Sequence, residues 1–280
     1  MTNFLRVVKA VTPFIPAEVF SDELKGNVGK NSEEELSLSY SLSDIWEAFI
    51  EWSCYGRGVP TLLNEELVTQ YYVPSLSAIQ LYIDPFLSDA NGSWNLSKIT
   101  GISLDKSIDD SNSNGKLLYE FFETEVPYKR MSLTDKALSL ASTFPELNTM
   151  KSCDLLSTSW ISVAWYPIYR NSMASTFKEL DACFLTYHSL STHSTRYPHI
   201  KVNGGKKDGK PINGAQDKKP MIPLPVFGLT CYKYKGSLLC PNKDHECEKE
   251  NSLLQAAEDW IRDRKVLHHD YEFFRSHQWM

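Results

Sequence analysis

The stretch that decides the fold is WISVAWYPIY, residues 160–169, which is followed by ACFLTYHSL, residues 182–190. Both segments are rich in β-branched and aromatic residues, which favour strands. Residues 176–179 between them have the T-x-x-E pattern of a short turn, so we expect the two strands to pair antiparallel. Pro167 has no N–H for a ladder, which predicts that its strand lies at an edge or carries a bulge there.

Four further segments have the composition of strands. Pro74-Ser75 separates the first two of them and predicts a tight hairpin. The segments are 69–74, 77–83, 117–123 and 226–236.

Helices are expected mainly toward the two ends of the chain. Ser41 and Asp44 form an S-x-x-D start for a helix over 42–55, and Gly56 is a natural stop. Further helices are predicted over 132–144, over 251–264 and, in a short form, over 271–277. Strands in bunches with helices at the ends predict an α+β fold. We therefore expect one domain, residues 1–280, with a mainly antiparallel or mixed sheet of five to seven strands and three to four helices. The expected core comprises Ile45, Trp46, Phe49, Ile161, Val163, Trp165, Phe184, Leu229, Leu254 and Trp260.

Three polar stretches interrupt these elements, and we expect flexible loops over 21–39, 84–116 and 201–220. The last holds six lysines against two aspartates, yet it contains no aromatic residue on which a base could stack. The whole chain carries a net charge of −6, which argues against a surface built to grip phosphates. We expect no specific nucleic acid among its partners.

We also expect no targeting signal in this sequence. Arg6 and Lys9 interrupt the apolar residues at the N-terminus, and no stretch approaches the ~20 apolar residues that span a bilayer. The six cysteines are spread over the chain without the density of a disulfide framework. The sequence predicts an intracellular protein, cytoplasmic or nuclear, that is neither secreted nor bound to a membrane.

Motifs of known chemistry are hard to find in the chain. The segment Gly204 to Lys210 resembles a phosphate-binding loop, but Pro211 stands where the magnesium-binding hydroxyl belongs. No G-x-S-x-G, H-E-x-x-H or G-x-G-x-x-G pattern occurs. We predict no catalytic residues and no cofactor.

A zinc site is a weak alternative. It would use Cys231, Cys240, His245 and Cys247, whose spacing lacks the close pairs of a structural zinc knuckle. Cys183 and His188 lie five residues apart on one predicted strand, so they point to opposite faces and make no catalytic dyad.

Several segments carry a family resemblance. SDIWEAFIEWSCYGRGVP (43–60), SCDLLSTSWISVAWYPIYR (152–170) and LDACFLTYHSLST (180–192) resemble a land-plant family known as domain of unknown function 789, as do 70–83 and 251–277. The resemblance implies a plant source and an intracellular protein, and it brings no activity, cofactor or catalytic residue.

The function that the sequence favours is a non-catalytic protein-interaction or regulatory module with a protein partner. The alternatives are an enzyme of unrecognised type, such as a hydrolase, and a small-ligand sensor. If 160–169 and 182–190 pair antiparallel, Arg170 meets Asp181 at one end of the sheet. Tyr169 and Arg170 could there anchor a carboxylate or phosphate of a partner, because arginine offers a bidentate fork. His188 is a separate candidate near the far end of its strand.

Overall fold

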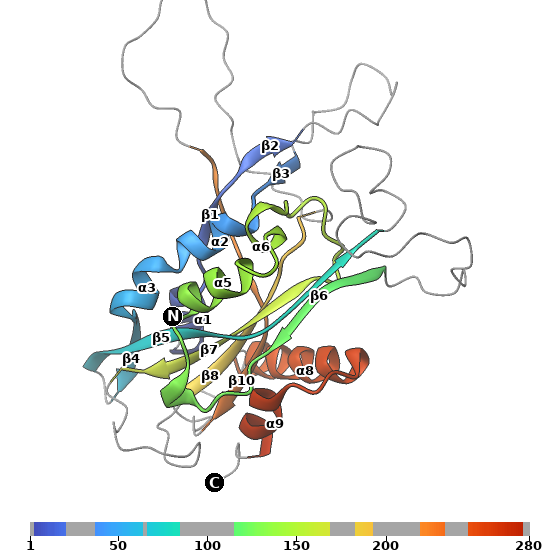
Figure 1. Ribbon diagram of the computed structural model, residues 1–280. Coiled ribbons are helices and arrows are strands. Elements are labelled where there is room, and N and C mark those ends of the chain that lie inside the picture. Colours follow the sequence, from blue (N-terminus) through green and yellow to red (C-terminus); the bar gives the residue numbers. More distant parts are fainter. Residues whose placement is uncertain are drawn as a thin grey trace, which may run out of the picture.

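The protein is built around one antiparallel sheet of six strands, as a computed structural model shows (Figure 1). The structure describes residues 3–20, 37–63, 66–84, 115–168, 183–192, 219–232 and 246–276. The strands follow the order β10-β8-β7-β5-β4, and β6 also pairs with β5. They are β4 (Arg57–Leu63), β5 (Glu66–Ile83), β6 (Lys116–Phe122), β7 (Trp160–Pro167), β8 (Cys183–Ser189) and β10 (Val226–Tyr232). The expected α+β architecture is confirmed.

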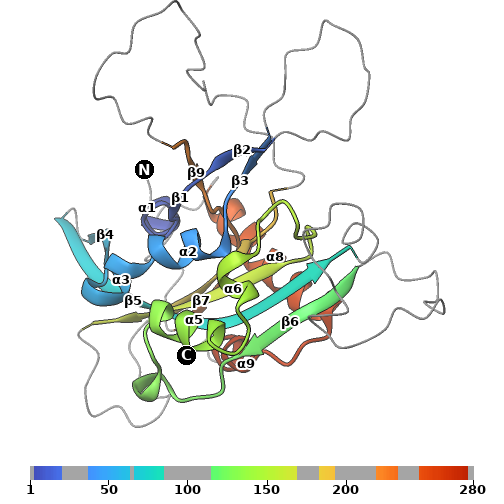
Figure 2. The ribbon, with the colours of Figure 1, turned by 45° about the horizontal axis from the view of Figure 1, so that its top comes forward.

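Helices cover both faces of this sheet and divide the core in two. The first group packs on one face around Ile45, Phe49 and Trp165. It consists of α1 (Asn3–Ala10), α2 (Leu42–Ala48), α3 (Ile50–Tyr55), α5 (Leu133–Ala141) and α6 (Glu146–Thr149). The other face carries α8 (Glu246–Arg264) and α9 (His269–Ser276), which pack against β10 and β8. Figures 1 and 2 show both layers.

Two small ribbons stand beyond one end of the large sheet (Figure 2). β1 (Phe14–Pro16) pairs with β9 (Met221–Pro223), and β2 (Glu18–Phe20) pairs with β3 (Ser37–Ser39), both antiparallel. β3 occupies the last residues of the first expected loop. The rest of that loop, and most of the loops expected over 84–116 and 201–220, lie outside the described residues, so their flexibility stays a prediction.

The central strand β5 corrects the predicted hairpin at Pro74-Ser75. The chain continues straight through Pro74, and β5 runs over 18 residues. Tyr71 O accepts a hydrogen bond from Ile168 N on the β7 side, so by alternation Pro74 turns its nitrogen to the opposite side. There β4 ends opposite Tyr72 and β6 begins opposite Ala78, so no strand needs the missing N–H.

Strand β7 lies inside the sheet, which makes the prediction of an edge or a bulge at Pro167 wrong. Its antiparallel pairing with β8 is confirmed, with Trp160 opposite Ser189 and Trp165 opposite Phe184. Pro167 is the last residue of β7, beyond that final pair. Within the part of the chain that the structure describes, the proline therefore costs the sheet no hydrogen bond.

The predicted helices form with changed bounds. The segment 42–55 breaks at Phe49 into α2 and α3, and Gly56 ends α3 with φ 76°. The carboxylate of Asp44 accepts the backbone N–H of Ser41 at 2.7 Å, as the start pattern predicts. α8 begins at Glu246 and α9 at His269, earlier than predicted. Neither α1 nor α6 was predicted.

The predicted core is largely buried. Eight of the ten expected residues are buried, and all eight belong to the cluster under α2 and α5. The other two, Leu254 and Trp260 of α8, are half-buried. Among the described helices, none is long and apolar enough to cross a membrane.

Candidate functional site

The structure describes one of the four binding residues that the sequence suggested. Tyr169, Arg170 and Asp181 lie outside the described residues, so their meeting at the end of the sheet stays a prediction. His188 is described, and it is completely buried on β8.

His188 has a full set of hydrogen-bond partners. Its Nδ1 lies 2.9 Å from the carbonyl oxygen of Leu224, which can only accept, so Nδ1 carries the proton. Its Nε2 then accepts from the Thr186 hydroxyl at 2.9 Å. Burial lowers the pKa of His188 to about 4, so the ring is neutral at physiological pH. These contacts make His188 a structural residue that holds β8 against the segment before β10.

The zinc alternative is described only at Cys231. This thiol lies on β10 in the core, and burial raises its pKa, which disfavours the thiolate that binds zinc. The side chains of Cys240, His245 and Cys247 lie outside the described residues. Within the ranges that the structure describes, no three His, Cys, Asp or Glu side chains gather as metal ligands.

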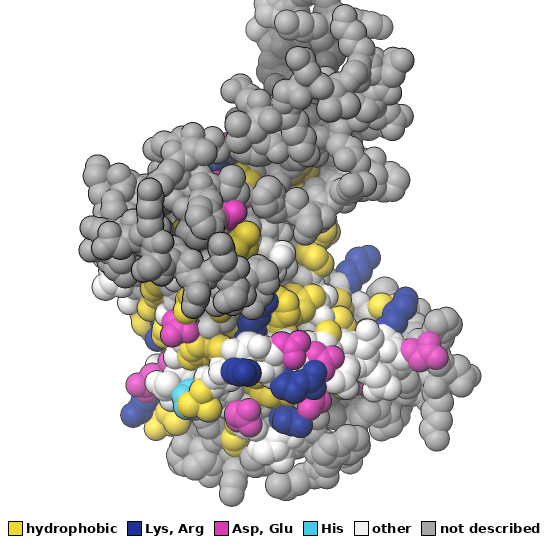
Figure 3. Space-filling view, turned by 90° about the vertical axis from the view of Figure 1, so that its right-hand side faces the viewer, with side chains coloured by type: hydrophobic (Ala, Val, Ile, Leu, Met, Phe, Trp, Pro, Cys, Tyr) yellow, Lys and Arg dark blue, Asp and Glu magenta, His cyan; other side chains and the backbone are white. Residues whose placement is uncertain are grey.

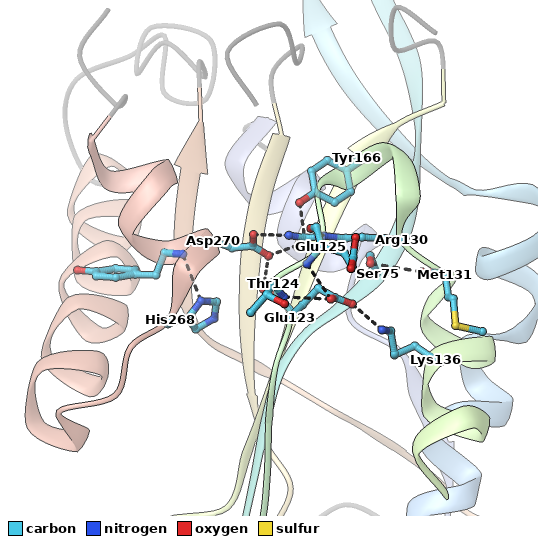
Figure 4. A network of polar contacts seen from close by, with 12 residues as sticks. Ser75, Glu123, Thr124, Glu125, Arg130, Met131, Lys136, Tyr166, His268 and Asp270 are labelled. Atoms are coloured by element: carbon cyan, nitrogen blue, oxygen red, sulfur yellow. Dashed lines mark hydrogen bonds and ion pairs between the residues drawn. The ribbon is translucent and has the colours of Figure 1, made fainter. Parts of the chain in front are cut away.

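A buried ion pair is the strongest polar feature of the interior (Figure 4). Arg130 Nη1 donates to Asp270 Oδ2 and Nη2 donates to Asp270 Oδ1, each at 2.6 Å. The two side chains are only 2% and 0% exposed. Asp270 Oδ2 also accepts from the hydroxyl of Ser77, and Arg130 Nη1 donates to Tyr166 Oη at 2.9 Å. The pair thereby joins α9, the loop before α5, β5 and β7.

This network fills the stretch of β5 that lies between the ends of β4 and β6. Glu123, just after β6, donates its backbone N–H to Ser77 O at 2.9 Å, and its carboxylate lies 2.9 Å from Lys136 Nζ. Its other oxygen accepts the backbone N–H groups of Thr124 and Glu125. The polar groups that a strand would otherwise satisfy are satisfied here by the loop.

His268 lies beside the ion pair among aromatic rings. Its Nδ1 accepts the backbone N–H of Tyr271 at 3.2 Å, so Nε2 carries the proton. The ring stacks on Trp160 with centroids 6.1 Å apart, and Tyr187 lies 5.9 Å away. Burial lowers the pKa of His268 to about 4. Since Arg130, Asp270 and His268 are all buried, a substrate does not reach them, and the network is best understood as a junction between α9 and the sheet.

A polar pocket lies where the ribbon β2–β3 meets α2. Its volume is about 240 Å³, and its charged walls are Glu18, Asp44, Lys151 and Lys219. Lys219 Nζ lies 2.8 Å from Glu18 Oε1. This contact lowers the pKa of Glu18 and raises the pKa of Lys219, so it favours the charged form of both side chains. The volume is below the ~300–1,000 Å³ of most small-molecule sites. An exposed pocket of matched charges gives little selectivity for a ligand.

The exposed apolar residues gather most clearly on the hairpin of β4 and β5. Leu62 lies directly opposite Leu67, and Tyr71 lies opposite Gly58 on β4 and Ile168 after β7. Directly opposite residues of an antiparallel pair share one face. We call this surface the hairpin face; it comprises Gly58, Pro60, Leu62, Leu67, Thr69, Tyr71 and Ile168.

The hairpin face is open to solvent and uncharged. Leu62 and Tyr71 are each 44% exposed, Leu67 is 58% exposed and Ile168 is 39% exposed. The face continues toward Tyr166 of β7, which belongs to the cluster under α8 and α9. In Figures 1 and 2, however, the hairpin extends away from both helices. A clustered apolar surface of this kind is typical of protein-binding sites.

The outer edge of β4 is closed to a further strand. The side chain of Asn3 accepts from Leu62 N at 2.6 Å and donates to Leu62 O at 2.8 Å. Two residues along the same edge, Pro60 has no N–H to offer. A partner therefore meets the side chains of the hairpin rather than its backbone.

The face shown in Figure 3 has a different character. Lysine and arginine side chains there stand among aspartate and glutamate side chains, and its described part shows no broad field of positive charge. Independently of this view, the exposed ion pairs Arg262–Asp259 on α8 and Arg275–Glu258 between α9 and α8 also contain both signs. Such mixed charge is typical of a solvated helix surface.

Sequence reasoning missed the hairpin face, Arg130 and Asp270. The segment RGVPTLL was not among the predicted strands, although it has the apolar spacing of one around Pro60. An edge strand tolerates proline, so the alternation of Val59 and Thr61 was the available signal. Arg130 and Asp270 are 140 residues apart, and nothing local marks their pairing.

Comparisons with known proteins bear on the whole chain. No curated protein and no solved structure matches it. A family model described as a protein of unknown function matches residues 2–100 and 88–274, nearly the full length. The chain therefore belongs to the DUF789 family of proteins of unknown function.

Proposed function

We propose that the protein is a non-catalytic interaction module that binds a partner protein through the hairpin face. The observation that carries this proposal is the group of exposed apolar side chains at Leu62, Leu67, Tyr71 and Ile168. Single exposed apolar residues are ordinary, but a connected set of them on one sheet face is unfavourable in water, and burying the set against a partner is stabilising. Tyrosine and leucine at such a surface provide contact area for a partner.

The polar groups of the interior support a binding module more than an enzyme. Two described histidines whose pKa values are clearly lowered, His188 and His268, are buried and neutral. The polar pocket beside β2 is small and carries paired charges. A hydrolase or a ligand sensor would be favoured by a deeper pocket with converging polar groups.

The cellular setting is also a proposal. The resemblance to a land-plant family supports a plant source and an intracellular place, cytoplasmic or nuclear. Cys183 and Cys231 are buried thiols that form no disulfide and lie in clusters on opposite faces of the sheet. Imaging of a fluorescent fusion of the full chain in plant cells tests this, and export from the cell would contradict it.

Affinity capture with matched variants tests the binding role. The full-length protein, Leu67→Asp and Leu138→Asp are each used as bait, and captured proteins are quantified by mass spectrometry. Leu138 is the control, because it is 53% exposed but lies on α5. We expect a set of proteins that Leu67→Asp loses and Leu138→Asp keeps. A set that both variants retain equally would overturn the proposal.

A further inference from the structure

Helix α9 is fastened to the sheet at its first turn (Figure 4). Asp270 in that turn accepts hydrogen bonds from Arg130 and Ser77. His268, the residue before the helix, accepts the backbone N–H of Tyr271 on its Nδ1 at 3.2 Å. His268 therefore caps α9, because it satisfies one of the N–H groups that a first turn leaves without a helical partner. α9 adds no strand to the sheet, so the helix can leave while the strands stay paired.

This cap requires a neutral His268 ring. A neutral imidazole has one nitrogen that accepts a hydrogen bond and one that donates, whereas in the imidazolium both donate. Protonation would turn Nδ1 of His268 into an N–H that points at the N–H of Tyr271. On the other side of the ring, Nε2 has no hydrogen-bond partner within the described part of the chain, so no acceptor there would stabilise the added charge.

The surroundings of His268 favour the neutral ring. The residue is 1% exposed, and burial lowers its pKa more strongly than the carboxylate of Asp270 raises it. Both Nη atoms of Arg130 already bind that carboxylate, and the positive charge of Arg130 lowers the pKa of His268 further. The charged or titratable side chains around the ring are Arg130 from the loop before α5, Asp270, His269 and Tyr271 from α9, and Tyr187 from β8.

Uncharged aromatic rings also border His268. The ring centroid of Phe122 on β6 lies 6.0 Å from that of His268, and the centroid of Trp160 on β7 lies 6.1 Å from it. A cation is attracted by an aromatic face within about 6 Å, so the stacked ring of Trp160 lies at the limit of that attraction. A proton on His268 therefore abolishes the cap and adds a cation beside Arg130, with little to compensate either loss.

We propose that α9 is an acid-released latch, which detaches from the sheet when a proton binds His268 while the strands remain folded. Release removes Phe274 and His268 from the aromatic side chains that they cover. The ring centroid of Tyr232 lies 5.7 Å from that of Phe274, and the centroid of Tyr187 lies 5.9 Å from that of His268. Both tyrosines are at most 1% exposed while α9 is docked, so detachment would open an apolar surface on the α8 side of the sheet.

The size of the effect follows from the two protonation equilibria of His268. Its pKa is about 4 while α9 is docked and returns to the ordinary 6.5 once the ring is in water. The ratio of released to docked molecules then rises roughly twentyfold between pH 7 and pH 5. The rise continues toward pH 4 and levels off below it, because both forms are then protonated.

Hydrogen exchange of the full chain, followed by NMR between pH 7 and pH 5, tests the latch. Dividing each observed rate by the intrinsic rate at the same pH leaves the opening equilibrium of each amide. We expect the opening of the α9 amides to rise about twentyfold over this range. The amides of β7 and β8 should remain far better protected at both pH values, because they exchange through unfolding of the sheet.

His268→Asn is the matched variant, because asparagine caps a helix but does not titrate. It should remove the pH dependence of α9 exchange, whereas His269→Asn, at an exposed position, should keep it. If the asparagine variant does not fold, His268→Gln, which is closer in size, takes its place. Equal protection of α9 and β8, α9 exchange that does not change with pH, or the full rise in a variant without His268 would each overturn the latch.

Discussion

Arg130 and Asp270 face each other in the interior with two N–O contacts of 2.6 Å, although 140 residues separate them in the chain. Burial by itself lowers the pKa of Arg130, but its contacts with Tyr166 and Asp270 outweigh that effect and raise it. The arginine is therefore charged in the folded protein, and α9 is held to the sheet through a buried charge.

Breaking this pair on one side should destabilise the protein strongly. Asp270→Asn keeps the shape of the side chain but leaves the Arg130 guanidinium buried without its counter-charge. We expect the free energy of unfolding in urea to fall by about 3–5 kcal/mol. The double variant Arg130→Met/Asp270→Leu, which removes both charges, should recover much of that loss.

The exposed pair Arg275–Glu258 is the matched control for this experiment. Its side chains are 54% and 37% exposed, so Glu258→Gln should cost no more than about 1 kcal/mol. Similar losses for Asp270→Asn and Glu258→Gln would show that the buried pair does not hold α9.

The two buried histidines predict a loss of stability in mild acid. Their folded pKa of about 4 lies below the ordinary 6.5, so the unfolded chain takes up protons that the folded chain refuses. Stability should therefore be full above pH 6.5 and fall as the pH drops from 6.5 toward 4, by roughly 3 kcal/mol for each histidine. Urea unfolding at a series of pH values measures the slope.

Variants of the two adjacent histidines, His268 and His269, distinguish this effect from the titration of carboxylates. His268→Gln should flatten the slope between pH 6.5 and 4, whereas His269→Gln, at an exposed position, should leave it unchanged. An unaltered slope in His268→Gln would mean that the folded protein takes up the proton on this ring as readily as the unfolded chain does.

The closed edge of β4 should keep the protein from self-association. Asn3→Ala frees the N–H and C=O of Leu62, and the added change Pro60→Thr restores a donor two residues away. We expect the double variant to form oligomers in sedimentation velocity at concentrations where the wild type does not. Lys9→Ala, at an exposed position of the same helix, is the control, and a double variant with unchanged sedimentation would contradict the role of Asn3.

The strands β7 and β8 could be predicted because both segments are rich in β-branched and aromatic residues. Trp160, Val163 and Phe184 are buried as that composition implies. The predicted helices share this property, since their stripes of apolar residues and their caps are local. Phe49 shows the limit of the method, because the break between α2 and α3 falls inside an unbroken apolar stripe.

Prolines misled the prediction in both central strands. Pro74 and Pro167 stand where the sheet has no bond to lose, and only the positions of β4, β6 and β8 reveal this. Proline in a strand is a signal about neighbours, and the neighbours are set by the whole fold.

The candidate site depended on the same long-range facts. His188 could be recognised as a polar residue on a strand, but its hydrogen-bond partner, the carbonyl oxygen of Leu224, is 36 residues away in the sequence. The exposure of Leu67 and Tyr71 follows from where α8 and α9 stop, which no spacing within residues 57–71 encodes.

Leu67 is the position at which the proposed role is best measured. The full chain is produced in cells with the photoreactive residue p-benzoylphenylalanine in place of Leu67 or, as the control, of Leu138. Because both side chains are exposed, neither replacement should change the free energy of unfolding by more than about 0.5 kcal/mol. After irradiation we expect a discrete adduct with another protein from position 67 and none from position 138. No adduct at position 67, or the same adducts from both positions, would contradict the assignment of the hairpin face as the binding surface.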